Sequence, residues 1–307
     1  MKARLVALLA LGLLAGPLAA VPLWTVESAD GAGRVMLLGS VHLLRAEDLP
    51  LPDVVRDAYQ SADRLVMELD PAELAPGASQ AALQRIGIRS PGGSAAELLN
   101  AEEWRLAETL AAEAGVDLQA VAPLEPWFGA IVLYTSALIA SGYDPALGVD
   151  QQIAGWAAHD AKPVAGLETL DEQLLLFKRL GAETQREMLL KTLEELVAME
   201  ADTDALVAQW RAGDLAALTR RLETDFRNYE ELRESIVVER NRNWLPAVEA
   251  LLNQGGTSLV VVGTLHLVGP EGLPALLAER GFRVMPGATH DVPPGSQRHG
   301  TITAPAR

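Results

Sequence analysis

Short apolar runs, each bounded by Gly, Pro or charged residues, recur along the chain and predict β-strands. They are too short for typical globular helices, and most lack polar interruptions, which is typical of strands buried on both faces of a sheet. Helical patterns fill the intervals, so the alternation favours an α/β fold with a central mixed sheet. The predicted strands are residues 34–38, 64–67, 163–165, 258–262 and 282–285.

The longer segments between these runs have the apolar spacing of helices. Residues 51–61 predict one helix, residues 95–113 one or two, and residues 126–141 an apolar helix of the buried kind. From about residue 169 to 252 no strand pattern occurs, so we expect a large helical insertion there. Its acidic residues, such as Glu194 and Glu200, are interpreted as the solvated face of amphipathic helices.

The chain contains an internal repeat that ends in histidine. Residues 35–43 (VMLLGSVHL) align with residues 259–267 (LVVVGTLHL), and a Leu-Pro pair follows the histidine at the same offset in both copies. In each copy an apolar strand ends in a Gly-x-x-His turn, and a helix and another strand are expected next. The repeat therefore predicts two pseudo-symmetric β-α-β units.

His42 and His266 end these two turns. We expect Gly39 and Gly263 to form turns that other residues would strain, which delivers each histidine just past the carboxyl end of its strand. Open α/β sheets bind ligands outside those ends. A pseudo-twofold pairing of the units would therefore bring both imidazoles into one site.

Glu68 and Glu168 occupy corresponding places on other predicted strands, because each directly follows an apolar run. A buried, unpaired carboxylate is costly, so each should face a cation, an arginine or a proton shared with the other. The alternative is that each caps a helix N-terminus, which suits Glu168 better than Glu68. Both are candidates for a catalytic role.

Two neutral imidazoles with one or two carboxylates form a suitable ligand set for a divalent metal with an open coordination position. Such a metal lowers the pKa of bound water toward ~7 and polarises a carbonyl, which allows hydrolysis without a covalent nucleophile. The chain has no cysteine, and N/O ligands suit several metals, so Mn, Zn and Co all stay open.

These motifs resemble those of the TraB/GumN family, which includes the Tiki metalloproteases and is related to erythromycin esterase-like and ChaN-like haem-binding proteins. The likeness covers nearly the whole chain after the leader. It implies paired β-α-β units and a metalloprotease centre in which His42, His266 and Glu68 bind the metal or activate water. The segments that carry it are residues 39–43, 68–70, 166–173, 239–241 and 263–269.

Arg240 matches the Glu-Arg-Asn stretch of that family. A guanidinium near the site could hold a carboxylate or stabilise an oxyanion, so Arg240 is a catalytic candidate. The alternative is an ion pair with Glu168 or Glu239 that orients its helix. Asp150 also falls at a family position, but it lies just before a predicted helix and is interpreted as a helix cap.

The two ends of the chain are not expected to belong to the folded domain, and the first end predicts export. Residues 1–20 combine two basic residues, an apolar stretch and small residues, which is the pattern of a cleaved signal peptide with no membrane anchor left afterwards. Residues 21–286 are then expected to form one α/β domain, and residues 287–307 a disordered tail. Loss of Lys2 and Arg4 lowers the net charge from −16 to −18, which disfavours nucleic-acid binding.

The sequence therefore predicts a periplasmic or secreted metal-dependent hydrolase, with a peptide or other carbonyl compound as its substrate. The oligomeric state stays open. One alternative is a haem- or cofactor-binding protein that uses a histidine as an axial ligand on the same scaffold. Another is an esterase with Ser40 as nucleophile and His42 as base, although the chain lacks a Gly-x-Ser-x-Gly elbow around Ser40. We expect the pocket walls to come from the helical insertion and from residues 126–141.

Overall fold

A computed structural model describes residues 21–89 and 99–287. Within these residues, six strands form one sheet in the order β4-β3-β5-β2-β1-β6. Strands β4, β3, β5 and β2 are parallel, whereas β1 is antiparallel to both of its neighbours. The predicted α/β fold with a mixed sheet is confirmed. The strands are β1 Leu23–Glu27, β2 Gly33–Ser40, β3 Arg64–Leu69, β4 Val164–Glu168, β5 Gly256–Gly263 and β6 Arg283–Pro286.

The two repeat units contribute four of the six strands of this sheet. The first runs β2–α1–β3 with α1 at Asp53–Ser61, and the second runs β5–α13–β6 with α13 at Leu273–Glu279. Strands β2 and β5 are adjacent and parallel, with Leu38 opposite Val261. Helix α1 packs on one face of the sheet and α13 on the other. The units are therefore related by the expected pseudo-twofold, except that β1, which the sequence pattern did not predict, separates β2 from β6.

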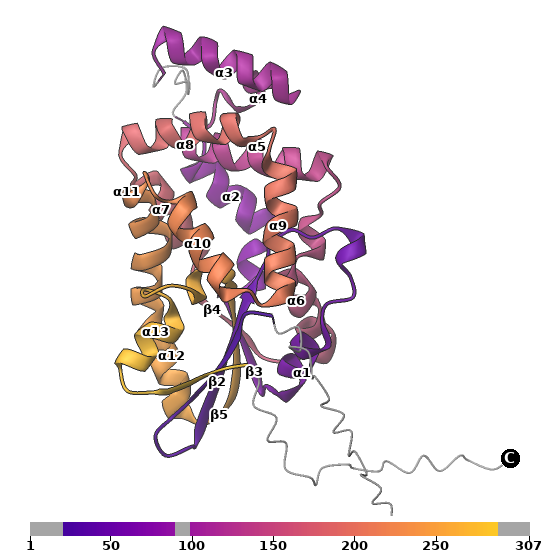
Figure 1. Cartoon of the computed structure of the whole chain (residues 1–307), viewed down its shortest axis with the longest axis vertical. Helices are drawn as coiled ribbons and strands as arrows, with labels where there is room; N and C mark the ends of the chain where they lie inside the picture. Colours follow the sequence, from indigo (N-terminus) through magenta and orange to yellow (C-terminus); the bar gives the residue numbers. More distant parts are fainter. Residues whose placement is uncertain (1–20, 90–98, 288–307) are drawn as a thin grey trace, which may run out of the picture.

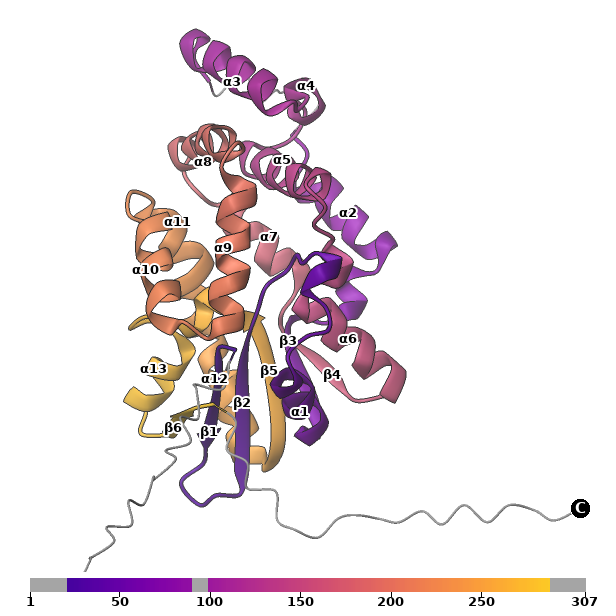
Figure 2. The same ribbon diagram turned by 45° about the vertical axis from the view of Figure 1, so that its right-hand side comes forward.

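The remaining helices cover the faces of the sheet and its carboxyl edge (Figures 1 and 2). Helix α12 packs on the same face as α13, and α6 on the same face as α1. Residues 169–252 contain helices and no strand, as predicted. The α-helices described, apart from α1 and α13, are α2 Pro76–Ile86, α3 Ala101–Ala114, α4 Leu118–Val121, α5 Pro126–Ala140, α6 Val149–Asp160, α7 Leu170–Lys178, α8 Ala182–Glu195, α9 Met199–Ala212, α10 Leu215–Asp225, α11 Glu230–Arg233 and α12 Arg240–Gln254.

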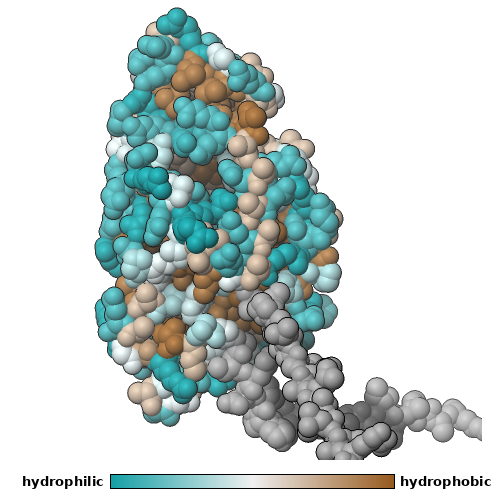
Figure 3. Space-filling model, in the orientation of Figure 1, coloured by the Kyte–Doolittle hydropathy of each residue, from teal (hydrophilic) through white to brown (hydrophobic). Residues whose placement is uncertain are grey.

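Helices α3 and α4 lie at the end of the molecule farthest from the sheet (Figure 1). Most of the face in Figure 3 is polar, and hydrophobic side chains gather near this end. Among residues 21–89 and 99–287, no helix has both the length and the apolar character needed to cross a membrane. The predicted signal peptide and residues 288–307 of the predicted tail lie outside the described residues, as does the start of the predicted helix at 95–113.

Candidate active site

The two histidines of the repeat lie at adjacent strand ends. Strands β2 and β5 end at Ser40 and Gly263, which are paired in the sheet register. His42 follows β2 directly, and His266 lies in a short 3-10 helix, η6 (Thr264–Leu267), that follows β5. A Cβ placed on Gly263 would lie 3.3 Å from Glu68 Oε1, 3.5 Å from His42 Nε2 and 3.6 Å from His266 Cδ2. The side chains of both histidines and Glu68 therefore converge around one point.

The glycines of the two turns are required for space rather than for backbone conformation. Neither has a positive φ, and Gly263 has φ −52° and ψ 138°, which any residue can adopt. A Cβ on Gly39 would lie 2.8 Å from Thr264 Oγ1 and 3.1 Å from Pro22 Cβ, too close for either neighbour. The expectation of strained turns was therefore wrong. Gly39 allows close packing of η6, and Gly263 keeps open the point where the site residues meet.

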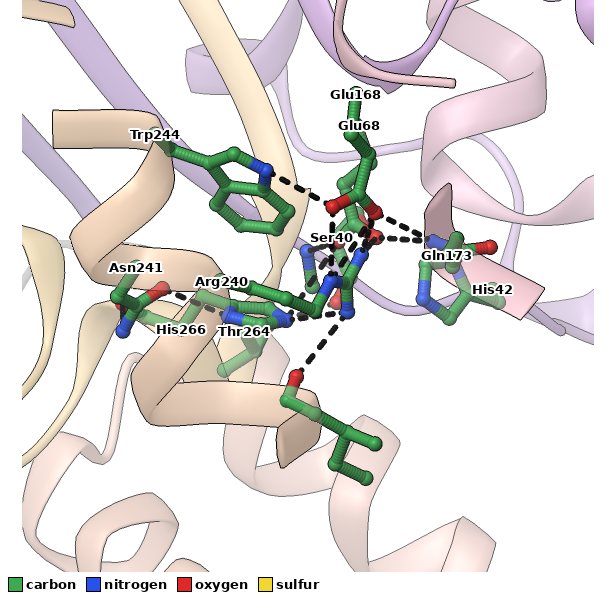
Figure 4. Close-up of polar contacts among 12 residues, drawn as sticks. Ser40, His42, Glu68, Glu168, Gln173, Arg240, Asn241, Trp244, Thr264 and His266 are labelled. Carbon is green, nitrogen blue, oxygen red and sulfur yellow. Dashed lines mark hydrogen bonds and ion pairs between the residues drawn. The ribbon is translucent and has the colours of Figure 1, made fainter. Parts of the chain in front are cut away.

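Arg240 lies at the centre of the polar network (Figure 4). Its Nη2 donates to Glu68 Oε2 at 2.5 Å and to Glu168 Oε1 at 2.6 Å, while Nε donates to Glu168 at 3.1 Å. The guanidinium also stacks on Trp244, with 4.5 Å between Cζ and the ring centre. Arg240 is only 8% exposed, and the side chains of Glu68 and Glu168 are 13% and 9% exposed, so this cation compensates two largely buried carboxylates. The ion pair between Arg240 and Glu168 agrees with the alternative in which Arg240 orients its helix. Glu239, the other expected partner, pairs with Arg179 instead.

A six-residue π-helix, Glu234–Glu239, directly precedes Arg240. Single π-helical turns are rare and occur often at functional sites, because they rotate the residues that follow. Here the carbonyl of Ile236 accepts a hydrogen bond from Arg240 Nη1 at 3.2 Å. The irregular turn thus helps to hold the guanidinium in its place at the start of α12.

Further donors complete the coordination of the two carboxylates. Gln173 Nε2 donates to Glu168 at 3.0 Å and to Glu68 at 3.3 Å, and Trp244 Nε1 donates to Glu168 at 3.1 Å. Glu68 Oε1 also accepts from the backbone N–H of Gly263 at 2.6 Å. The interpretation of Glu168 as a helix cap is wrong, because Thr169 caps α7. Gln173 was not predicted as a site residue, although it ends the segment 166–173 on which the family resemblance rests.

The tautomer of His266 follows from its neighbours. Asn241 Nδ2 donates to the backbone carbonyls of His266 and Glu271, which directs its Oδ1 toward His266 Nδ1 at 2.8 Å. The proton of His266 therefore sits on Nδ1, and the lone pair of Nε2 accepts from Arg240 Nη1 at 3.0 Å. In the arrangement described, His266 is a neutral acceptor.

Asp150 is the partner of His42. Asp150 Oδ1 lies 3.2 Å from His42 Nδ1, which leaves Nε2 of His42 as the nitrogen that faces the site. The interpretation of Asp150 as a helix cap was wrong, since the N-cap of α6 is Gly148, without a side-chain cap, and Asp150 lies in the first turn. The backbone N–H of Val149 donates to Val41 at 2.9 Å, so the start of α6 is fixed against the end of the first turn.

The charges in the site shift its pKa values in opposite directions. Burial is the largest single influence on the pKa of Glu68 and would raise it, but Arg240, the two histidines and the backbone N–H of Gly263 together outweigh burial, and the pKa falls to about 2. Burial and then Arg240 lower the pKa of His266 to about 3, in agreement with its neutral tautomer. Burial raises the pKa of Glu168. Asp150 raises the pKa of His42, although solvent screens this pair because 57% of the His42 side chain is exposed.

Comparison with known proteins places the chain in a family. Residues 22–286 match the TraB/PrgY/gumN family. The chain belongs to this family. It is 26% identical over 251 residues to the "Uncharacterized protein YbaP" of Escherichia coli K12, and the values for the protein of the same name from Shigella flexneri are the same. Each of these alignments covers 78% of this chain and 86% of the relative. An "Uncharacterized protein" of Treponema pallidum is 23% identical over 273 residues, 84% of this chain and 80% of the relative. No solved structure matches.

The donors in this TraB/PrgY/gumN site match a divalent metal in their chemistry. Nδ1 of His42 is hydrogen-bonded to Asp150, and Nδ1 of His266 to Asn241. Metal-binding histidines usually have such an oxygen partner on the ring nitrogen that does not bind the metal. His42 Nε2 and Glu68 Oε1 face the same point beside Gly263. Nε2 of His266, however, is hydrogen-bonded to Arg240. Among the described residues, no three His, Asp or Glu side chains are arranged so that they could bind a metal ion as they stand. Metal binding at all three would therefore require Arg240 to release His266.

Two cavities meet at the end of β2 in this family member. One, of about 350 Å³, is lined by Glu68, Asp150 and Gln173 among others. The second, of about 260 Å³, is lined by Arg240, His266 and side chains of the helical insertion and α5, so its walls come from the predicted segments. Ser40, His42 and Leu43 line both cavities. His42 therefore lies at the junction of the two cavities.

Proposed function

We propose that the chain is an exported metal-dependent hydrolase that cleaves a peptide or a similar carbonyl substrate. The observation that carries this proposal is the convergence of His42 Nε2, Glu68 Oε1 and the His266 ring around Gly263, from the two repeat units. Between two cavities, this set offers N and O donors at one position where a substrate can reach them. A divalent metal held by His42, His266 and Glu68 would supply an activated water and polarise the carbonyl.

The chain's own residues have separate roles in this proposal. Asp150 fixes the His42 ring so that Nε2 faces the reacting atoms, and Asn241 does the same for His266. Glu68 is a carboxylate at neutral pH, because Arg240 keeps its pKa low, and it can accept the proton of an attacking water. Arg240 is a buried cation beside the site and can stabilise negative charge that develops on the carbonyl oxygen.

The esterase alternative receives no support from the position of Ser40. Its Oγ is buried and has no hydrogen-bond partner among the described residues, so no base lies in reach of the hydroxyl. An activated serine requires a base within about 2.6–3.2 Å of its oxygen. We therefore assign Ser40 no nucleophilic role.

A peptide-library assay tests the proposal. Purified protein is incubated with proteome-derived peptides, with and without a chelator, and the products are identified by mass spectrometry. We expect cleavage that the chelator abolishes and that added Mn, Zn or Co restores, and no cleavage by Glu68→Gln. The control variant His159→Ala removes an exposed histidine far from the site and should remain active. No cleavage under any metal, or full activity of Glu68→Gln, would contradict the proposal, and a Soret band in the purified protein would favour the haem-binding alternative.

A further inference from the structure

The second cavity, of about 260 Å³, combines site residues with a largely apolar lining. Ser40, His42, Arg240 and His266 line it, and Tyr134, Thr203 and Thr264 add three hydroxyl groups to its walls. The other walls come from α5, α7, α9, the end of α10, the π-helix and η6. Their apolar side chains include Leu138, Phe177, Leu206, Phe226, Ile236 and Leu265. We call this space the apolar pocket. It suits a ligand that is apolar at one end and polar at the end nearest His42.

The size of the apolar pocket restricts what it can hold. A dry apolar cavity of about 150 Å³ takes up benzene. At about 260 Å³, the apolar pocket has room for an aromatic ring or a branched aliphatic chain with its attached main-chain atoms. The remaining length of a peptide would have to leave through the junction at His42 and enter the other cavity.

Ser40 provides an independent sign that a ligand binds at this junction. Its side chain is only 3% exposed, lines both cavities, and has an Oγ without a hydrogen-bond partner among the described residues. An unpaired buried hydroxyl is destabilising, so native proteins rarely retain one without a partner. A main-chain amide or carbonyl that passes His42 would supply the partner.

We infer that the apolar pocket binds the bulky apolar side chain of the substrate residue that flanks the hydrolysed bond, while Ser40 bonds to the substrate main chain. That the ligand is part of a substrate rests on the proposed hydrolase function. That the pocket binds an apolar side chain does not rest on it. The site should therefore prefer Phe, Leu or Met beside the bond over Ala or a charged residue.

Binding of small peptide analogues tests the pocket without catalysis. Affinities of N-acetyl-phenylalaninamide and N-acetyl-alaninamide are measured by ligand-observed NMR against wild type. We expect the phenylalanine compound to bind at least about tenfold more tightly, because burial of the larger side chain favours binding by about 1.5–3 kcal/mol. Leu206→Trp and Phe226→Trp each fill the pocket from a different helix and should abolish this difference. Val197→Trp, at a position that is 73% exposed, is the matched control and should keep it.

The inference would be overturned if wild type bound both compounds with equal affinity. It would also be overturned if both filled variants kept the wild-type difference in affinity and the wild-type melting temperature. Cleavage profiles separate this failure from failure of the proposed function. Binding that Leu206→Trp removes, without cleavage of any peptide, supports the pocket and contradicts the hydrolase. Cleavage with no preference for apolar residues on either side of the bond supports the hydrolase and contradicts the pocket.

Discussion

Nη1 of Arg240 lies 3.0 Å from Nε2 of His266, so the nitrogen that would bind a metal accepts a hydrogen bond from a guanidinium. The same guanidinium contacts Glu68 and Glu168. Arg240 is therefore the cation that neutralises the site when no metal is bound, and a metal would compete with it for the same donors.

Arg240→Met should destabilise the protein by about 3–5 kcal/mol at pH 7, because removal of the cation leaves two buried carboxylates uncompensated. The free energy of unfolding in urea measures the loss. Arg242→Met is the matched control, since Arg242 is 60% exposed and its pair with Glu234 should contribute less than about 1 kcal/mol. Equal losses in the two variants would contradict the role assigned to Arg240.

Stability should fall as the pH drops below about 6.5, the ordinary pKa of histidine. The pKa of His266 is lowered to about 3 in the fold, so between these pH values the unfolded chain binds a proton that the folded chain does not. Stability therefore rises with pH in this window. Glu68, with its pKa lowered to about 2, adds a further loss below about pH 4.5.

Urea unfolding between pH 4 and 7 measures this dependence. His266→Gln should weaken the slope between pH 5 and 7, whereas His159→Gln, at an exposed position, should leave it unchanged. A slope in His266→Gln equal to that of wild type would show that His266 is not buried in its neutral form.

Asp150→Asn should lower the pKa of His42 toward its ordinary value, because the carboxylate is the main cause of the upward shift. Histidine ring signals followed by NMR as a function of pH report this pKa directly. Asp160→Asn, beside the exposed His159, is the control and should leave His42 unaffected. An unchanged His42 titration in Asp150→Asn would remove Asp150 from the site.

Gly263→Ala should preserve the fold but reduce hydrolysis. The backbone at Gly263 accepts alanine, but the added Cβ would lie 3.3 Å from Glu68 Oε1, so that carboxylate must shift by a few tenths of an ångström, and the Cβ would contact His42 Nε2 at 3.5 Å. A displacement of about 1 Å in an active site can cost about a hundredfold in rate, so this smaller shift should cost less than that. Gly155→Ala, in α6 with no atom near the new methyl group, should keep full activity. Full activity of Gly263→Ala at unchanged melting temperature would contradict the convergence of the site at Gly263.

The sequence was sufficient for the frame of the fold and for the two histidines and Glu68 that converge beside Gly263. The repeat correctly predicted adjacent strands that lead to His42 and His266, because similar local patterns build similar units. It missed β1, which pairs across the sheet with β2 and β6 and has no counterpart in the repeat. It also missed the role of Asp150, which reaches His42 across 108 residues of chain, a contact that local spacing does not reveal.

The glycines show a different limit. Sequence reasoning assigned Gly39 and Gly263 to strained turns, because glycine most often marks an unusual backbone. In the fold their role is steric, and it depends on atoms from Thr264, Glu68 and His42 that only the tertiary structure brings near. When a glycine is required because neighbouring atoms leave no room for a Cβ, the local sequence does not show which atoms those are.

Metal analysis of the purified protein tests the central claim most directly. Wild type, His42→Ala, His266→Ala and the control His159→Ala are loaded with Mn, Zn or Co in turn, desalted and measured by inductively coupled plasma mass spectrometry. We predict about one bound ion per chain in wild type and His159→Ala, and a loss of the ion in both site variants, because the two histidines share one site. Equal metal content in all four proteins, or no metal in wild type under any loading, would contradict the account.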